Sequence, residues 1–582
     1  MTILDSFKNL PVPILLPASV AGLAVLYTAN VPATARIPIA ASLLAVAFIG
    51  LTHIFTRLRY SYQLSQIKSP GSKTLEPPQI YYSLPFLGNA LDFLAPGPGL
   101  FWKQLFKSHP RDTGACTLLL GGLPTHILFD PTAVQAIFKA KGPNRDRFNE
   151  QVMGSGFGFP RSEVVKFFAL GQPASFEYNG REGLTAREKQ EAISHEYLMK
   201  TDAVNELTST FVFHMRKSLN SDDRLAKGQS LEIGLVEYLR PHLFKASIVA
   251  LMGERLLEIY PELSTDFWEF DKYMLTLFFG LPRFVSPKAY KALEKCKAGM
   301  LRQQEICFKE CNGEPEDPSG SVGWEPIWGS RANRSRQCFY KEVDMLPSSK
   351  AAADLAFMFG IASNAIPAAG WFLMHLLDPY GDQTLLPRLM KELKTAQRPD
   401  GSLDVSTLCG LTLLQSMWQE ILRLYTDVLV TRDTRQDITL PFDEGKKKML
   451  FRAGSVIMAP SYLGHHDERA WMDPPCEQFY AERFLVDNPE TGLSQFSMNG
   501  TPGKLFPFGG GKTICPGRIF AKQEVLASVA MVLLTFDFDF VSYTDLGGNK
   551  TSRFPGPADV FQGTGVIAGN GDVRVRIKRK LT

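Results

Sequence analysis

A glycine-rich segment near the C-terminus constrains the fold of this chain more than any other feature. It runs from Phe506 to Arg518 as Phe-Pro-Phe-Gly-Gly-Gly-Lys-Thr-Ile-Cys-Pro-Gly-Arg, and a stretch with helical character, 519–536, follows it. Successive glycines let the backbone turn tightly and approach a flat partner closely. Cys515 stands just before a helix N-terminus, where partial positive charge lowers the pKa of a thiol. The segment therefore predicts a thiolate that faces several backbone N–H groups.

A thiolate in this position is either a nucleophile or a metal ligand. The glycines could instead bind a phosphate, but Gly511-Lys512-Thr513 lacks the preceding spacing of a Walker A loop. A buried structural cysteine is the remaining alternative. The segment alone leaves these possibilities open.

Two further elements lie upstream. Glu420-Ile421-Leu422-Arg423 places a carboxylate and a guanidinium three positions apart, on one face of a helix, where they can form a buried ion pair. The second element is Phe479-Tyr480-Ala481-Glu482-Arg483-Phe484. An isolated Glu-x-x-Arg is usually a solvated pair on a helix surface. It becomes informative only together with the other two elements.

The glycine-rich segment resembles the haem-binding signature of the cytochrome P-450 family, Phe-x-x-Gly-x-x-x-Cys-x-Gly. The signature positions are filled in register by Phe508, Gly511, Cys515 and Gly517. The resemblance implies that the chain binds haem b and that Cys515 is the axial thiolate of the iron. A thiolate in that position donates electron density and favours cleavage of the O–O bond of bound oxygen.

The upstream elements match the same family, in the family's order. Glu420 and Arg423 fill its Glu-x-x-Arg, and 479–484 matches its Phe-x-Pro-Glu-Arg-Phe with Ala481 where proline is usual. By resemblance, Arg483 completes a triad with Glu420 and Arg423 on the haem side. The implied fold is mainly α with a small β subdomain. The resemblance is weakest over residues 140–345.

Ala351 to Leu377 predicts a long apolar helix, which by composition alone is equally a transmembrane helix. Asn364, with Pro367 three residues later, instead fits a distorted helix that opens toward a buried site. By resemblance this is the family's central helix, whose usual motif is Ala/Gly-Gly-x-Asp/Glu-Thr. Asn364 takes the place of that threonine, which with the acid relays protons to bound oxygen.

The sequence Asn-x-x-Pro-Ala, with the nearby Trp371, resembles the branch that contains cholesterol 7α-hydroxylase and prostacyclin synthase. The segment Thr513-Ile514-Cys515-Pro516-Gly517-Arg518 resembles the 7α-hydroxylase form. Most of the superfamily has an arginine at the position of Thr513, where it contacts a haem propionate. We therefore expect another residue to make that contact, with Arg432 the first candidate and Lys200 a weaker one.

Two functions remain open because the branch contains both sterol hydroxylases and isomerases of peroxides. The first is oxidation of a lipophilic polycycle, such as a sterol, triterpenoid or specialised metabolite. It uses O₂ and NADPH electrons from cytochrome P-450 reductase, with cytochrome b5 as a further partner. The second is reductase-independent isomerisation or dehydration of a peroxide or related oxygenated lipid. Asn364 hydrogen-bonds oxygen but relays protons poorly, which is why the second function stays open.

The N-terminal region predicts a membrane anchor. Ile37 to Phe55 carries no charge and is long enough to cross a bilayer core of about 30 Å at about 1.5 Å per residue. The run Pro11 to Thr28 is a second span or an interfacial segment, and a cleaved signal peptide is the competing interpretation. Basic residues after Phe55 place the bulk of the chain in the cytosol, on the endoplasmic reticulum membrane. They are Arg57, Arg59, Lys68 and Lys73.

The expected organisation is an anchor over residues 1–60, a proline-containing linker over 61–95 and a catalytic domain over 96–582. Residues 311–347, rich in Gly, Pro, Ser and Trp in their first part, are expected to form a surface insertion. With 45% hydrophobic residues, the 582-residue chain is not disordered over most of its length. The near balance of 63 Lys and Arg against 59 Asp and Glu carries no nucleic-acid signature.

Overall fold

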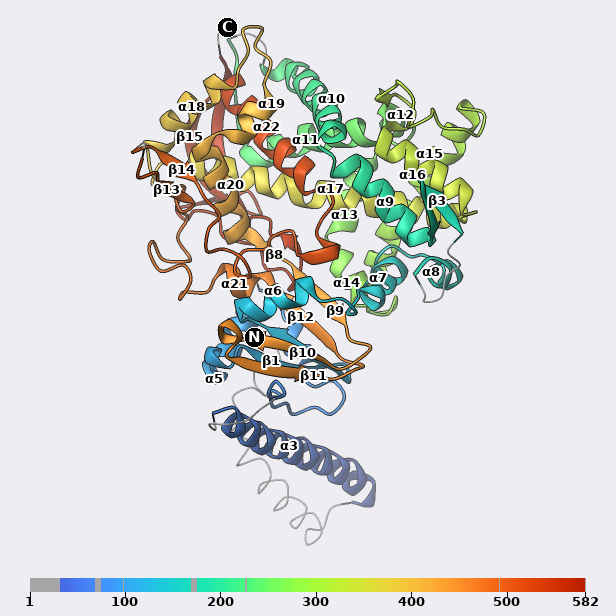
Figure 1. The fold of residues 1–582 in the computed structure, drawn as a ribbon, viewed down its shortest axis with the longest axis vertical. Coiled ribbons are helices and arrows are strands. Elements are labelled where there is room, and N and C mark those ends of the chain that lie inside the picture. Colours follow the sequence, from blue (N-terminus) through green and yellow to red (C-terminus); the bar gives the residue numbers. More distant parts are fainter. Residues whose placement is uncertain are drawn as a thin grey trace. The chain divides into compact units, whose positions relative to one another are not determined.

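The computed structural model describes residues 32–68, 75–97, 99–168, 175–225, 228–490 and 492–580. The chain divides into two compact units (Figure 1). The first unit comprises Met1–Asn144, Leu429–Gly464 and Pro502–Lys504. The second comprises Arg145–Val428, His465–Thr501 and Leu505–Thr582.

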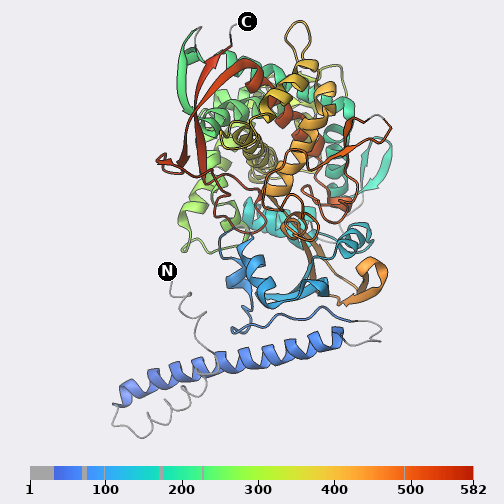
Figure 2. The same ribbon diagram turned by 90° about the vertical axis from the view of Figure 1, so that its left-hand side faces the viewer.

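The first unit begins, in its described part, with the long helix α3, Ala33–Lys68, the blue helix of Figure 2. Its apolar side chains are largely uncovered, with Phe48 59% and Phe55 69% exposed, and Arg36–Ile67 is long and apolar enough to cross a membrane. The last turns differ, because Thr56 donates a hydrogen bond to the Tyr82 carbonyl and Tyr60 is buried. The helix therefore continues past the expected anchor boundary at residue 60 and is tied to the first unit. The expected run Pro11 to Thr28 lies outside the described residues.

The first unit is built on a four-stranded sheet in the order β1-β2-β12-β9. β1, Ala115–Leu120, and β2, Leu123–Leu128, form an antiparallel hairpin across Gly121 and Gly122, which both have positive φ. β12, Val456–Pro460, runs parallel to β2 and antiparallel to β9, Leu429–Asp433. β10, Ile438–Phe442, and β11, Lys447–Phe451, form a second hairpin. Consecutive glycines supply the left-handed backbone that the first turn requires.

The second unit is mainly helical (Figure 1). Its sheet has the order β16-β15-β18-β5, and a two-stranded ribbon joins β8, Thr426–Asp427, to β17, Gly565–Val566. The sheet strands are β16, Lys550–Thr551, β15, Phe536–Asp545, β18, Gly571–Arg579, and β5, Ser230–Gly234. The main helices are α9, Ala186–Leu198, α10, Thr201–Asn220, α11, Leu235–Met252, α13, Leu263–Asp271, α15, Pro287–Glu310, α17, Pro347–Leu376, α20, Thr412–Tyr425, and α22, Arg518–Thr535.

Helix α17 is the central element of the second unit. It packs against α11, α15, α20 and α22, and Figure 1 shows it among these helices. Leu355, Trp371 and Leu373 are completely buried, so the protein itself accounts for its apolar composition. The transmembrane interpretation of this segment is thus replaced by a core helix. The helix is continuous from Pro347 to Leu376 with Pro367 inside it, and Pro367 has no N–H to donate within the helix, so the local distortion at this turn stays a prediction.

The segment 311–347 has two parts, since 311–327 is exposed or half-buried, as predicted for a surface segment, and 328–340 is mostly buried. It contains the short strands β6, Trp324–Glu325, and β7, Gly329–Ser330, and the helix α16, Arg331–Glu342. Trp328 and Arg334 are almost fully buried, and Arg334 donates to the carbonyls of Val322 and Gly323. Arg336 of α16 likewise donates to the Ala353 carbonyl, whereas Ser335 Oγ and Gln337 Oε1 have no partner among the described residues.

Candidate active site

The glycine-rich segment forms a closed loop that presents Cys515 just before α22. The Cys515 N–H donates to the Phe508 carbonyl at 3.0 Å, and Arg518 donates back to the Cys515 carbonyl at 3.2 Å. Gly509 and Gly511 have φ of +72° and +66°, a left-handed conformation that side chains disfavour. A Cβ on Gly517 would lie 3.8 Å from the Cys515 sulfur, so the glycine leaves that side of the sulfur open.

Opposing effects act on the Cys515 thiol. Burial, the largest, raises its pKa, whereas the backbone N–H groups of Gly517 and Arg518 lower it. The positive charges of Arg518 and Arg145 also lower the pKa. A partly buried sulfur surrounded by N–H donors and cations is suited to carry negative charge once a metal replaces its proton.

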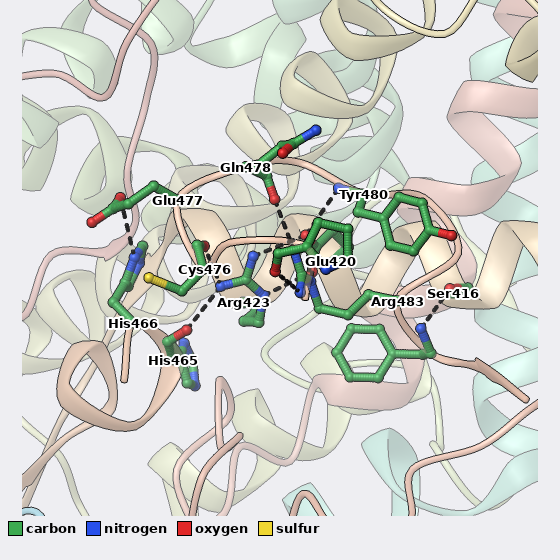
Figure 3. Close-up of polar contacts among 12 residues, drawn as sticks. Ser416, Glu420, Arg423, His465, His466, Cys476, Glu477, Gln478, Tyr480 and Arg483 are labelled. Atoms are coloured by element: carbon green, nitrogen blue, oxygen red, sulfur yellow. Dashed lines mark hydrogen bonds and ion pairs between the residues drawn. The ribbon is translucent and has the colours of Figure 1, made fainter. Parts of the chain in front are cut away.

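The predicted ion-pair triad lies in the second unit with every charge paired (Figure 3). Arg423 Nε donates to Glu420 Oε2 at 2.7 Å and its Nη2 to Oε1 at 2.8 Å, while Arg483 Nε donates to Oε1 at 3.0 Å. The Tyr480 N–H adds a further hydrogen bond to Glu420. Arg423 and Arg483 donate their other protons to carbonyls, which are those of His465, Cys476, Pro474, Pro475 and Gln478. We call Glu420, Arg423 and Arg483 the haem-side triad.

His465 joins the haem-side triad to the cysteine loop, a connection that sequence reasoning missed. Its carbonyl accepts from Arg423 at 2.9 Å, and its Nε2 accepts the Phe506 N–H at 3.0 Å. Burial holds the pKa of His465 well below its usual range, so the ring is neutral and Nε2 is free to accept. An isolated histidine outside any motif offered no signal in the sequence.

A second polar region lies at the middle of α17. Gly360, Ser363 and Asn364 share one side of the helix, and we call this side the α17 face. The face is open, because Ser363 and Asn364 are only half-buried and no heavy atom comes within 4 Å of a Cβ built on Gly360. Asn364 Oδ1 accepts the Val566 N–H at 3.0 Å, which fixes the orientation of the amide. Its Nδ2 has no hydrogen-bond partner within the described residues.

The strand that holds Asn364 is itself firmly anchored. The N–H of Ile567 donates to the Tyr425 carbonyl, and its carbonyl accepts from the Trp371 indole, both at 2.7 Å. The Trp371 and Tyr425 rings stack at 3.7 Å. Trp371, noted in the sequence for its resemblance to one branch of the family, thus holds the C-terminal loop against the α17 face.

Asp427, on β8 opposite Gly565, is another buried residue that sequence reasoning missed. Its Oδ2 accepts the Gly563 N–H at 3.2 Å, but Oδ1 has no partner in the part of the chain that the structure describes. Burial raises its pKa to about 7. A carboxyl of this kind is a candidate for a functional group.

The candidates for the haem propionate contact have different positions. Arg432 lies on β9 of the first unit, buried, with Nη1 donating to the Thr431 carbonyl. Lys200 forms an exposed ion pair with Glu196 and is a solvated charge. Arg145, in the second unit, is a candidate that the sequence did not indicate, because its charge acts directly on Cys515.

The donor set at Cys515 is compatible with haem. Among the described residues, no group of three or more His, Cys, Asp and Glu side chains could hold a metal ion. Porphyrin iron brings its ring ligands with it and takes a single thiolate from the protein, which Cys515 just before α22 can supply.

Comparison with known proteins agrees with this geometry. The cytochrome P-450 family model matches residues 260–550. Cytochrome P-450 monooxygenase calL of Penicillium decumbens is 31% identical over 529 residues, covering 88% of this chain and 94% of that protein. Cholesterol 7-alpha-monooxygenase of Cricetulus griseus is 27% identical over 364 residues, 59% of this chain and 67% of that protein.

The solved structure of retinoic acid-bound cyanobacterial CYP120A1 has the same fold. It superposes with a TM-score of 0.60 at 18% identity, over 88% of this chain and 100% of that one. Family membership implies haem with a cysteine thiolate on the iron, as the resemblance predicted. The chain therefore belongs to the cytochrome P-450 family and is an oxidoreductase, a haem-thiolate monooxygenase.

Proposed function

We propose that this chain is a membrane-anchored monooxygenase that hydroxylates or otherwise oxidises a lipophilic polycycle, such as a sterol, triterpenoid or similar specialised metabolite. Haem supplies the activation of O₂ by two electrons and the insertion of one oxygen atom into a C–H bond. Cys515 is the proposed ligand, and Phe508, Gly511 and Gly517 shape its loop. Arg145 is the proposed cation for the haem carboxylates, and Arg432 stays the candidate that the sequence predicted.

The open α17 face is the observation that carries this proposal. It lies in the middle of a helix whose other turns are mostly buried. Phe357, Phe359 and Ile361 are half-buried apolar side chains on the same stretch of α17. The pairing of an apolar surround with a single fixed amide at Asn364 suits a large lipophilic molecule that carries few polar groups.

The membrane and partner proposals rest on other features. The uncovered apolar surface of α3 supports insertion into a bilayer, which we propose to be the endoplasmic reticulum membrane with the catalytic domain in the cytosol. Electrons would come from NADPH–cytochrome P-450 reductase, with cytochrome b5 as a further donor. The named activity of the Cricetulus griseus relative on cholesterol supports a polycyclic substrate.

One observation favours the alternative, a reductase-independent isomerase or dehydratase of an oxygenated lipid. An amide is neither acidic nor basic enough to take up and pass on a proton, and Asn364 Oδ1 already accepts the Val566 N–H, so the side chain can position an oxygen atom but cannot supply a proton. An isomerase needs only to hold an oxygen atom, whereas a monooxygenase also needs a proton supply.

The first test is the absorption spectrum of the reduced, CO-bound protein in membranes. A strongly red-shifted Soret band is expected for the wild type, its loss is expected in Cys515→Ala, and its retention is expected in Cys338→Ala, a half-buried control on α16. Retention of the band in Cys515→Ala would refute the ligand assignment. Product formation that requires NADPH and reductase supports the monooxygenase, whereas formation without them supports the isomerase.

A further inference from the structure

Helix α17 lacks the carboxyl and hydroxyl pair that its position in the family leads one to expect. Ser363 and Asn364 stand where an acid and a threonine are usual, so no carboxyl lies on this turn of the helix. Oxygen reduction to water consumes protons, and the proposed function therefore needs a group at the α17 face that holds and releases them.

A carboxyl reaches this face from another helix. Ser363 Oγ donates to Asp271 Oδ1 at 2.5 Å, and Asp271 is the last residue of α13. The distance is that of a strong hydrogen bond between a hydroxyl and a carboxylate. Asp271 receives no other hydrogen bond from the described residues, and the residue as a whole keeps some solvent exposure.

Aromatic packing holds α13 in place beside α17. Phe270 precedes Asp271 in the chain, and its ring lies 6.2 Å from that of Phe359 on α17. Phe157 contacts both rings, at 5.9 Å and 5.8 Å. Phe270 and Phe157 are buried, so the hydrogen bond between Asp271 and Ser363 lies beside a rigid cluster.

Pro367 adds a second feature at Ser363. Proline has no N–H, so it cannot donate to the carbonyl of the residue four positions earlier, which is Ser363. Oδ1 of the neighbouring Asn364 accepts the Val566 N–H, which leaves its amide N–H groups to donate. The α17 face thus offers the Ser363 hydroxyl and the Asn364 N–H donors, which can orient a water molecule or a substrate oxygen.

We propose that Asp271 and Ser363 form the proton-delivering pair of this enzyme, with the carboxyl supplied by α13 in place of the acid missing from α17. Asp271, when protonated, donates its proton to Ser363 Oγ, while Ser363 releases its own proton to an oxygen atom at the α17 face. Asp271 is left as a carboxylate and takes a new proton from water. Asn364 orients the accepting oxygen and transfers nothing.

The electrostatics of Asp271 suit this role. Burial raises its pKa to about 6, and the hydrogen bond from Ser363 and the charge of Arg240, on α11, oppose that rise. The carboxyl therefore binds and releases protons near neutral pH. The inference rests on the proposed monooxygenase function, because an isomerase has no need of such a pair.

The first experiment needs neither haem nor substrate. The infrared carboxyl stretch is recorded from about pH 4 to about pH 8 for the wild type and for Asp271→Asn. We expect a protonated-carboxyl band with a midpoint near pH 6 that is present in the wild type and missing in Asp271→Asn, whereas the bands of other buried carboxyls, such as Asp427, should be the same in both proteins. In Ser363→Ala the midpoint should move upward, because the hydrogen bond from Ser363 favours the carboxylate. A midpoint that Ser363→Ala leaves unchanged overturns the pair.

The second experiment measures NADPH oxidation and hydrogen peroxide release by the full-length holoenzyme with reductase, in phosphatidylcholine vesicles that contain cholesterol as the probe. Asp271→Asn and Ser363→Ala should slow NADPH oxidation about ten-fold or more, and should raise the peroxide released per NADPH. The rate of NADPH oxidation by the wild type should fall as the pH rises past the Asp271 pKa. In Asp271→Asn this fall in rate should be much smaller. Ser363→Thr, which keeps the hydroxyl, should retain most of the rate.

The control is Glu269→Gln, a carboxyl-to-amide change at an exposed position of the same helix. Suppose that Asp271→Asn and Ser363→Ala change only the melting temperature and leave the pH dependence of NADPH oxidation as in the wild type. The hydrogen bond then merely holds α13 against α17, and the inference fails. If the wild type oxidises no NADPH with reductase, the proposed function fails, and the infrared result still decides whether the pair is coupled.

Discussion

Glu420 and Asp427 stand close together in the sequence and are almost equally inaccessible, yet their surroundings are opposite. Glu420 receives hydrogen bonds from Arg423, Arg483 and the Tyr480 N–H, so both of its oxygens are paired. Asp427 receives one, from the Gly563 N–H, and Oδ1 has no partner among the described residues. The charged groups of the haem-side triad thus all have partners. The region of β8, β17 and the α17 face, in contrast, contains polar atoms without a partner among the described residues.

The difference between these two carboxyls indicates that the first region stabilises the fold and that the second is suited to chemistry. A buried network in which every charge is paired resists rearrangement and suits a scaffold for the cysteine loop. Half-satisfied groups with pKa values near neutral destabilise the fold, and they persist where they bind or transfer something. The comparison predicts that removing a carboxyl from the first region harms the protein and that neutralising one in the second stabilises it.

The largest effect is expected from Glu420→Ala. Two buried guanidinium groups lose their counter-charge, which should lower the free energy of unfolding by about 3–5 kcal/mol and give haem-poor protein. Urea unfolding and the haem-to-protein ratio measure this. Glu294→Ala, which removes one partner of the exposed Arg283–Glu294 pair, is the control and should cost less than about 1 kcal/mol. Normal haem content in Glu420→Ala would contradict a structural role for the triad.

Asp427→Asn should act in the opposite direction and depend on pH. Because the folded-state pKa of Asp427 is raised from 3.8 to about 7, the wild type loses stability as pH rises between these values. The variant avoids that loss and should be more stable at pH 8 by a few kcal/mol, since one pKa unit corresponds to about 1.4 kcal/mol. Near pH 4 the two proteins should melt alike. Equal stability at both pH values would show that Asp427 is well solvated or paired.

Gly565→Ala tests the contact that fixes Asn364. Gly565 has φ of +94°, and a Cβ there would lie 2.4 Å from Asn364 Oδ1. The substitution should cost about 1–3 kcal/mol from backbone strain and should also displace the amide. Gly548→Ala is the matched control, because Gly548 has φ of +78° but open space around it. A thermal melt in which the two variants lose the same stability would mean that Asn364 can move freely.

The smallest effect on stability is expected from Asn364→Thr. One hydrogen bond to the Val566 N–H is weakened, at a cost of about 1 kcal/mol, and haem should be retained. The ratio of product to NADPH should change, because the oriented N–H donor is lost. Asn364→Asp keeps an oxygen that accepts the Val566 N–H but removes the amide N–H donor. It therefore tests the loss of the donor while the C-terminal loop stays anchored. If neither rate nor coupling moves in Asn364→Thr, the residue is structural.

The sequence predicted the parts of the site that are local. Phe508, Gly511, Cys515 and Gly517 lie within one short segment, and Glu420 and Arg423 within one helical turn, so spacing alone indicates their arrangement. The long apolar runs in the sequence also predicted α3 and α17 as long helices. Composition did not predict that the second part of the segment 311–347 is buried, because it reports how many polar groups a segment has and not how the fold covers them.

Short motifs and their resemblance to one family predicted the mainly α fold, the haem-thiolate loop and the ion-pair motif, because the residues of each motif are neighbours along the chain. Only the tertiary structure brought Ser363 to Asp271, 92 residues away, and Asn364 to Val566, 202 residues away. The same packing left Asp427 Oδ1 without a partner. No local pattern specifies such contacts, since they arise from how α13, α17 and the C-terminal loop pack to bury their apolar surfaces.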